Sequence, residues 1–149
     1  MQLSPLFTIT VDVDPPQSAG VTPIGEVRLL PFRGGTFEGP GLRGKLLPGG
    51  TDWQQVRADG VLEIRAHYML ETDQGERIEV ISQGIRHAAP EVLERLSRGA
   101  PVPADQYYFR THIRLNTAAP RLLHLNRMLA VSSGERMQSS VKLTFYAVP

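Results

Sequence analysis

Residues Val61–Glu71 read VLEIRAHYMLE, and this stretch decides the fold class. Apolar side chains occupy every second position, with Leu62, Ile64 and Leu70 on one face, and charged side chains occupy most of the positions between them. A period of two is typical of a β-strand that packs one face against a core. The stretch therefore predicts a strand in an antiparallel sheet rather than a helix.

The segments on either side repeat this extended character and are separated by turn residues. The expected strands are Leu6–Val13, Gly25–Phe32, two short strands joined by a turn at Gly39-Pro40-Gly41, Asp52–Arg57, Val61–Glu71, Arg77–Arg86, Tyr107–Leu115, Met128–Ser132 and Val141–Val148, the last two around a turn near Gly134. One amphipathic helix is expected near Pro90–Arg98, because Pro90 suits a first helical position and Gly99 a C-terminal cap. Pro120–Leu125 is compatible with a single helical turn.

Nine or ten short strands without strand–helix alternation favour an all-β fold in a single domain, residues 1–149. We predict a closed antiparallel β-barrel of about 8–10 strands with one short helix, since closure removes exposed strand edges. A strongly bent sandwich is the alternative. A barrel of this size has room for side chains or for one small ligand.

Composition excludes several classes of function. The formal net charge is +1, so no basic field is available to attract nucleic acid. The chain has no cysteine, which excludes disulfides, thiol catalysis and cysteine-ligated metal. The longest apolar runs, such as Met128–Val131, are four residues, too short for a membrane span or a signal peptide. We expect a soluble cytoplasmic protein with no cofactor, no metal and no membrane partner.

The glycine-rich and histidine positions do not form recognised sites. The segment Gly34–Pro40 lacks the order of a phosphate-binding loop and is interpreted as turns and bulges at barrel corners. The four histidines are widely spaced, without the short spacing of a metal-binding pair.

A tryptophan beside a carboxylate is the first candidate for a site. Trp53 offers a flat apolar wall for a ligand, and Asp52 is a candidate for proton transfer. The alternative is that Trp53 plugs a barrel end while Asp52 pairs with an arginine.

Two strands carry further candidates. Tyr108, Arg110 and His112 share one strand face, which suits the lining of a polar pocket or, alternatively, a solvated outer face. Arg65 is the second candidate cation. An interior arginine needs an acidic partner, and the available carboxylates are Asp52, Asp59 and Glu63.

Taken in order, the motifs resemble the DUF3237 proteins, also called UPF0311, over nearly the whole chain. The matching motifs are Gly34–Pro40, Leu42-Arg43-Gly44, Leu47–Trp53, Arg57, Asp59-Gly60, Thr72–Gly75, Gly84-Ile85-Arg86, Tyr107–Thr111 and Leu125-Asn126-Arg127. The chain departs from the family pattern at Thr51, at His124 in place of a tryptophan, and at Leu115-Asn116-Thr117 in place of Phe-x-Thr.

The resemblance implies a closed antiparallel barrel, often oligomeric. Some fungal relatives resemble cyclases of aromatic polyketide-type substrates, which implies cofactor-free acid–base chemistry on a small aromatic molecule.

These observations together predict a pocket for a small, partly aromatic, anionic or phenolic molecule. Trp53, Arg65, Arg110 and Asn126 are the expected ligand-binding residues, and Asp52 or Tyr108 is the expected catalytic group if chemistry of the cyclase or isomerase type occurs. The rival hypothesis is a non-catalytic oligomeric barrel whose arginines and carboxylates form a structural network. Under either hypothesis we expect a homodimer or a higher homo-oligomer.

Overall fold

The computed structural model describes residues 1–149 and contains ten strands. They are β1 (Ser4–Val13), β2 (Gln17–Thr22), β3 (Gly25–Gly39), β4 (Leu42–Leu46), β5 (Thr51–Val56), β6 (Leu62–Thr72), β7 (Arg77–Ala88), β8 (Tyr107–Asn116), β9 (Leu129–Arg136) and β10 (Ser140–Val148). All pairings between them are antiparallel, as the alternating sequence predicts.

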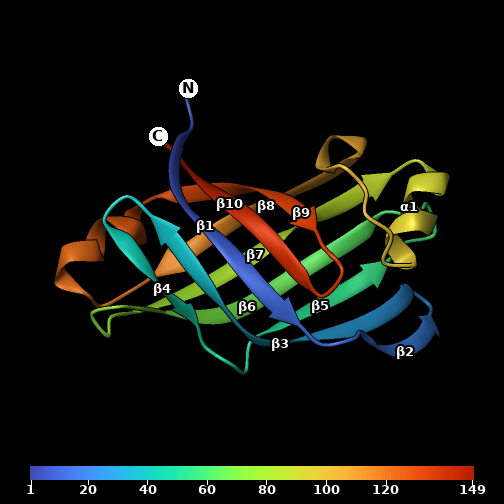
Figure 1. Cartoon of the computed structure of the whole chain (residues 1–149), viewed down its shortest axis with the longest axis horizontal. Helices are drawn as coiled ribbons and strands as arrows, with labels where there is room; N and C mark the ends of the chain where they lie inside the picture. Colours follow the sequence, from blue (N-terminus) through green and yellow to red (C-terminus); the bar gives the residue numbers. More distant parts are fainter.

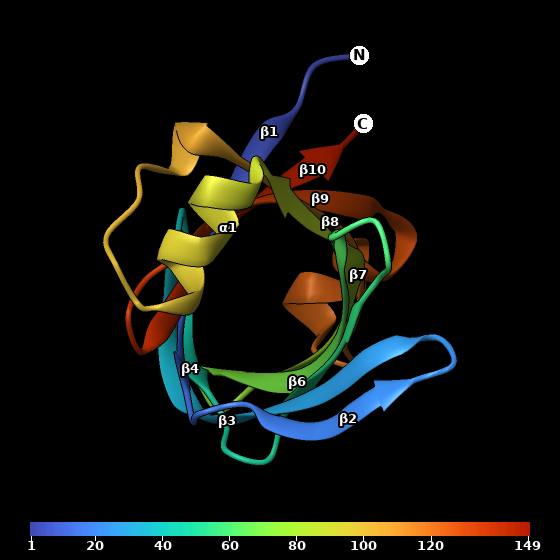
Figure 2. The ribbon, with the colours of Figure 1, turned by 90° about the vertical axis from the view of Figure 1, so that its right-hand side faces the viewer.

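The strands close into a barrel with eight positions (Figure 1). β1 pairs with β10 on one side and with β3 on the other, and β10 continues through β9, β8 and β7 to β6. β4 and β5 share the position between β3 and β6, and each pairs with both of those strands. β2 pairs only with β3, and its hairpin projects from the wall (Figure 2). The predicted closed antiparallel barrel is therefore confirmed.

Three details of the strand prediction need correction. β3 runs through Phe32 to Gly39 as one strand, β2 was not predicted, and Gly134 lies within β9 because the turn comes later, at residues 137–139. β3 continues through its glycines because β1 approaches it there. A Cβ atom on Gly35 would lie 2.2 Å from the carbonyl oxygen of Thr10, so only glycine permits this pairing.

The helical segments lie at the two ends of the barrel. The predicted helix is α1 (Pro90–Ser97), and two 3₁₀ segments accompany it, η1 (Ala104–Gln106) and η2 (Pro120–Arg127). α1 lies over one end of the barrel (Figure 2), whereas η2 lies at the opposite end (Figure 1). Leu122 and Leu125 of η2 are buried, so η2 closes that end with apolar side chains.

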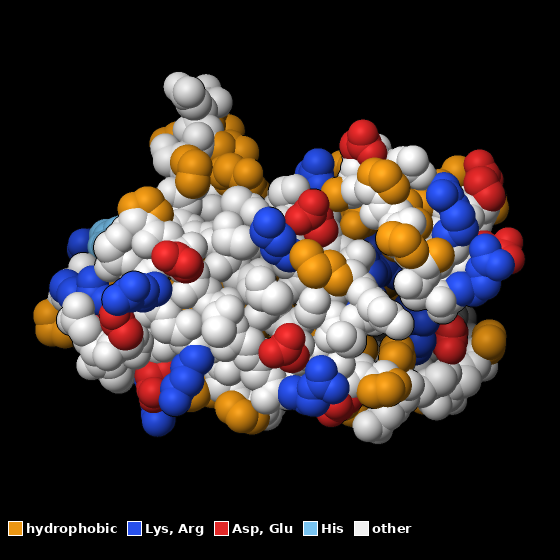
Figure 3. Space-filling model, in the orientation of Figure 1, with side chains coloured by type: hydrophobic (Ala, Val, Ile, Leu, Met, Phe, Trp, Pro, Cys, Tyr) orange, Lys and Arg blue, Asp and Glu red, His pale blue; other side chains and the backbone are white.

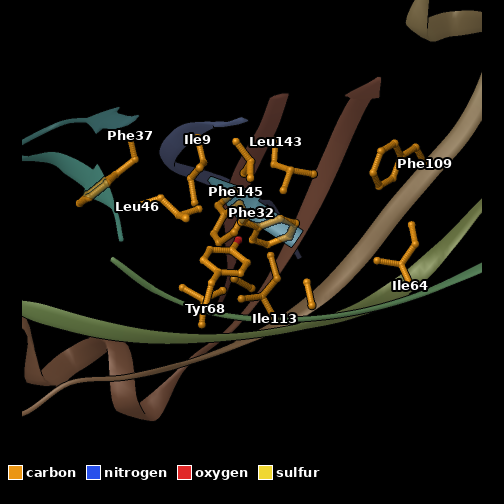
Figure 4. Packing of buried hydrophobic residues seen from close by; sticks show 14 of the residues in the cluster. Ile9, Phe32, Phe37, Leu46, Ile64, Tyr68, Phe109, Ile113, Leu143 and Phe145 are labelled. Carbon is orange, nitrogen blue, oxygen red and sulfur yellow. The ribbon is translucent and has the colours of Figure 1, made fainter. Parts of the chain in front are cut away.

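The hydrophobic core fills the half of the barrel nearer η2. Phe7 packs against Phe37 and Phe145, with ring centroids 5.5 and 4.9 Å apart. Figure 4 shows Phe37, Leu46 and Phe145 pointing into the same interior space. These side chains come from the consecutive paired strands β10, β1, β3 and β4, so their packing stabilises the part of the wall where β1 closes the barrel.

The outer surface mixes charges of both signs. Figure 3 shows blue and red side chains interspersed, with apolar side chains between them at the end that carries α1. Large exposed apolar side chains include Val21, Ile24, Trp53 and Leu129. The expected homo-oligomer stays a prediction. No helix of the chain has the length and apolar character needed to cross a bilayer.

Candidate functional site

A cavity of about 190 Å³ lies inside the barrel at the end nearer α1. Leu96 and Ser97 of α1 line its outer part, which places it beneath that helix. Its apolar lining comes from Val11, Pro16, Leu30, Phe32, Leu62, Ile64, Ala66, Phe109, Val141 and Leu143. Its polar lining comes from Arg28, Asp52, Gln54, Tyr68, Ser82, Arg86, Ser97, Thr111 and Arg136. The cavity thus combines an apolar wall with a cluster of charged and polar side chains.

Strand alternation brings the three arginines of this cluster inside. Arg28, Arg86 and Arg136 each lie on the same strand face as buried residues, because successive side chains of a strand point to opposite sides. The buried residues in phase with them are Leu30 and Phe32 in β3, Ile78, Val80 and Ser82 in β7, and Ala130 and Ser132 in β9.

Asp52 is the only carboxylate that lines the cavity, and it is 5% exposed. The side-chain amide of Gln54 donates to one of its oxygens at 2.8 Å, and the backbone N–H of Arg65 donates to the other at 3.0 Å. Arg28 in turn donates to the Gln54 amide oxygen at 3.1 Å. Burial raises the pKa of Asp52 to about 6, against the opposing effects of these hydrogen bonds and of the nearby Arg86 and Arg28. A carboxyl in this state exchanges a proton near neutral pH.

Arg86 lacks the partner that a buried guanidinium normally has. Its Nε atom is buried without a hydrogen bond, and no carboxylate lies within 4 Å of it. Burial, together with the positive charges of Arg136 and Arg28, lowers the pKa of Arg86 to about 10. Burial and Arg28 also lower the pKa of Arg136, whose guanidinium donates to the Ser140 carbonyl. The cavity therefore contains three arginines and only one carboxyl group.

Tyr68 adds a neutral polar group to the lining. It is 4% exposed, and its hydroxyl has no hydrogen-bond partner within the protein. Burial, and secondarily the charge of Asp52, raises the pKa of Tyr68 well above its ordinary value, so the phenol stays protonated. Thr111 and Ser132, by contrast, satisfy each other through a hydrogen bond of 2.6 Å.

The structure places only one of the six predicted site residues in the cavity. Asp52 lies there, but Trp53 is 45% exposed on the outer face of β5, and Arg65 is exposed on the outer face of β6. Tyr108 is 52% exposed, with the Arg110 guanidinium 5.4 Å from its ring centre on the outer face of β8. The prediction that these side chains converge with Asp52 is wrong, because each is out of phase with the buried residues of its strand.

Two further predictions about the site are also wrong. Asn126 does not reach the cavity, and its amide instead makes two hydrogen bonds with the backbone of Thr117, which hold η2 to the end of β8. Asp59 and Glu63 do not meet an interior arginine, because both pair with Arg57 outside the barrel.

Sequence reasoning missed the arginines and the tyrosine that do line the cavity. A signal for them exists, since Arg28, Arg86 and Arg136 fall in phase with the apolar face of their strands, and Tyr68 shares a face with Leu62 and Ile64. An arginine in phase with apolar neighbours is the pattern that indicates an interior cation.

Comparison with known proteins gives a consistent result. The family described as "Protein of unknown function (DUF3237)" matches residues 1–148. A UPF0311 protein of Rhodopseudomonas palustris is 37% identical over 143 residues, which covers 96% of this chain and 94% of the relative. Its crystal structure superimposes with a TM-score of 0.94 and 36% identity, over 99% of this chain and 97% of that one.

Two other solved structures have the same fold. A "beta-barrel like protein" of Acinetobacter baumannii has a TM-score of 0.86 and 37% identity, over 99% of this chain and 96% of that one. A structure described as an enzyme from Penicillium herquei has a TM-score of 0.74 at 20% identity, over 99% and 94%, which shows the fold alone. The match over almost every residue, with the shared barrel, means that this chain belongs to the DUF3237 family, also called UPF0311.

Proposed function

We propose that this protein binds a small, partly aromatic anion in the cavity inside its barrel. The observation that carries the proposal is Arg86, a largely buried guanidinium with no carboxylate within 4 Å. Burying a charge without a partner is strongly unfavourable. An anionic ligand supplies the missing partner, and a guanidinium matches a carboxylate through two hydrogen bonds.

The volume of the cavity sets the size of the ligand. It measures about 190 Å³, and an engineered apolar cavity of roughly 150 Å³ in another protein takes up benzene. A single substituted ring therefore fits, whereas a fused polycyclic molecule does not. The aromatic side chains Phe32 and Phe109 in the lining suit a flat ring.

The rival hypothesis, a structural network of arginines and carboxylates, accounts for part of the site. Arg28, Gln54 and Asp52 do form a connected chain of hydrogen bonds inside the protein. The same hypothesis leaves Arg86 unexplained, because a purely structural network would give each buried cation a partner. This difference is what favours ligand binding over the rival.

The experiment compares an interior arginine with an exterior one. Benzoate and phenolic acids are titrated calorimetrically into the parent protein, Arg86→Met and Arg110→Met. We expect Arg86→Met to weaken benzoate binding by at least about tenfold, because an ion pair in a desolvated site is lost. The same variant should melt at a higher temperature, since it removes an uncompensated buried charge. Arg110→Met, on the outer face, should change neither property.

Two results would count against the proposal. If the parent binds none of these acids, the structural network is the better interpretation. If Arg110→Met weakens binding while Arg86→Met does not, the ligand lies on the outer face of β8 beside Tyr108, and the interior cavity is not the site.

Acid–base chemistry is the second candidate function, and Asp52 favours it. A carboxyl whose pKa is raised to about 6 suits a general acid or base near neutral pH. The barrel shared with a Penicillium herquei protein described as an enzyme is compatible with catalysis, although at 20% identity it assigns no residue. Asp52 is the better placed of the two predicted proton-transfer groups, because Tyr108 lies outside.

An exchange measurement tests this chemistry without a known substrate. Phenylpyruvate, an aromatic keto acid with enolisable hydrogens, is incubated with the protein in deuterated water and followed by NMR. We expect the parent to accelerate exchange of the methylene hydrogens and Asp52→Asn to abolish that acceleration. Equal exchange rates for parent and variant would remove Asp52 from the proposal.

A further inference from the structure

The hydroxyl of Tyr68 is a buried polar group that nothing in the protein satisfies. It is one of three buried side-chain atoms without a hydrogen-bond partner, and the other two belong to Arg28 and Arg86 of the same cavity. Buried hydroxyls almost always have a partner, because a hydroxyl without one loses its hydrogen bonds to water and gains nothing in return. An orphan of this kind in the lining of a cavity calls for an explanation.

Packing holds the Tyr68 ring in place. Its ring meets Phe32 edge to face, with centroids 5.5 Å apart. Figure 4 shows the Tyr68 ring among Phe32, Ile113 and Phe145, in the interior of the barrel. The ring therefore cannot swing out to solvent, and its hydroxyl stays where a ligand in the cavity would meet it.

The protonation state of Tyr68 fixes the role that its hydroxyl can play. Burial raises its pKa far above neutrality, so it is a neutral phenol that donates a hydrogen bond. No hydrogen bond joins this donor to Asp52, whose oxygens accept from Gln54 and from the Arg65 backbone. The free donor matches an acceptor oxygen on a ligand.

The register separates this donor from the cations along the barrel. Arg86 lies opposite Leu62 at the start of β6, two residues before β7 ends and the chain turns toward α1. Tyr68 lies opposite Val80, further from α1 along the same strand pair. Arg86 thus lies near the α1 end of the cavity, and the Tyr68 hydroxyl lies on the side of the filled core.

We propose that Tyr68 is a specificity-determining residue that donates a hydrogen bond to a second oxygen of the ligand. The ligand class is then an aromatic carboxylate that also carries a hydroxyl or carbonyl oxygen on its ring, remote from the carboxylate. This proposal rests on the proposed anion binding at Arg86. It adds selection for a second oxygen, which anion binding alone does not require.

The experiment measures selection for oxygen against a methyl group of similar size. Calorimetry compares 2-, 3- and 4-hydroxybenzoate, each with the corresponding methylbenzoate, and with benzoate as the reference. We expect 3- or 4-hydroxybenzoate, whose hydroxyl is remote from the carboxylate, to bind the parent about tenfold more tightly than its methyl analogue, the value of roughly one hydrogen bond. In Tyr68→Phe, which keeps the ring and loses the donor, that preference should fall to about twofold or less.

A matched variant and a melting measurement act as controls. Tyr146→Phe removes a hydroxyl from β10 outside the cavity lining and should leave the preference intact. Tyr68→Phe should melt no lower than the parent, because it removes an unsatisfied polar group. A lower melting temperature would mean that a bound water satisfies the hydroxyl in the free protein and would overturn the proposal.

The possible results distinguish a failure of the role proposed for Tyr68 from a failure of the proposed anion binding at Arg86. If benzoate binds but no hydroxy isomer exceeds its methyl analogue, anion binding stands and the role of Tyr68 is wrong. If no acid in the panel binds, the proposed function itself fails. If Tyr68→Phe does not fold, the hydroxyl is already satisfied in the free protein, and the role of Tyr68 as a free donor is overturned.

Discussion

The two ends of the barrel interior are built on opposite principles. Toward η2, the interior is filled with interlocking apolar side chains such as Phe7, Phe37 and Phe145, and residues such as Leu70 and Ile78 have no exposed surface. Toward α1, the same strands enclose a cavity with three arginines and one carboxyl. The inward face of a strand thus changes from apolar to polar along its own length.

This difference indicates that one end of the barrel stabilises the fold and the other end forms the candidate site. The filled end follows the rules of a stable core, with close packing and no unsatisfied groups. The cavity breaks them, since it holds an empty volume, an unpaired guanidinium near α1 and, at its border with the filled core, a hydroxyl without a hydrogen-bond partner. Departures of this kind are costly to stability and concentrate at functional sites. The contrast leads to three predictions about stability.

The largest expected effect comes from truncating the filled end. Leu70→Ala should lower the free energy of unfolding by about 3–5 kcal/mol, because Leu70 is fully buried in tight packing and leaves a new void. Leu62, in the same strand and almost as buried, lines the existing cavity, so Leu62→Ala should cost only about 2 kcal/mol. Urea unfolding of both variants measures the difference. Equal losses would mean that the two ends are packed alike.

The second effect concerns Asp52 and appears in the pH dependence of stability. Because its pKa is raised from 3.8 to about 6 on folding, its neutral form stabilises the fold fully below 3.8, and this contribution is lost as pH rises through about 6. The loss amounts to about 3 kcal/mol at 1.36 kcal/mol per pKa unit. Asp52→Asn should therefore flatten the decline between pH 4 and 7.

Denaturant unfolding at several pH values checks this expectation, with Asp14→Asn as a surface control. A variant with the slope of the parent would show that the Asp52 carboxyl titrates as an exposed group does. The interior near α1 would then be more solvated than its burial indicates.

The smallest effect is expected outside the barrel. Arg65→Ala should change the free energy of unfolding by no more than about 0.5 kcal/mol, because the side chain is exposed and makes no ion pair. Thermal melting beside Arg86→Met measures the contrast between outer and inner faces. A loss of several kcal/mol at Arg65 would place a buried contact on the outer wall, as an interface between copies of the chain would.

The sequence by itself determined the elements and the family. Alternation along Val61–Glu71, the turn at Gly39-Pro40-Gly41 and the proline that starts α1 all have local causes, and each prediction is confirmed. These features follow from backbone geometry and from side-chain period, which neighbouring residues specify without help from distant ones. The closed antiparallel barrel followed from the number of short strands and from the family motifs.

Only the tertiary structure decided which polar residues face inward and meet one another. Asp52 and Arg86 lie on β5 and β7, 34 residues apart in sequence. A period of two defines two faces of a strand without stating which one the barrel encloses. Arg110 was expected inside and lies outside, because closure turns the face of Phe109 and Thr111 toward the core. A strand buries the face with more apolar area, and its polar members are buried with it because the backbone allows no other phase.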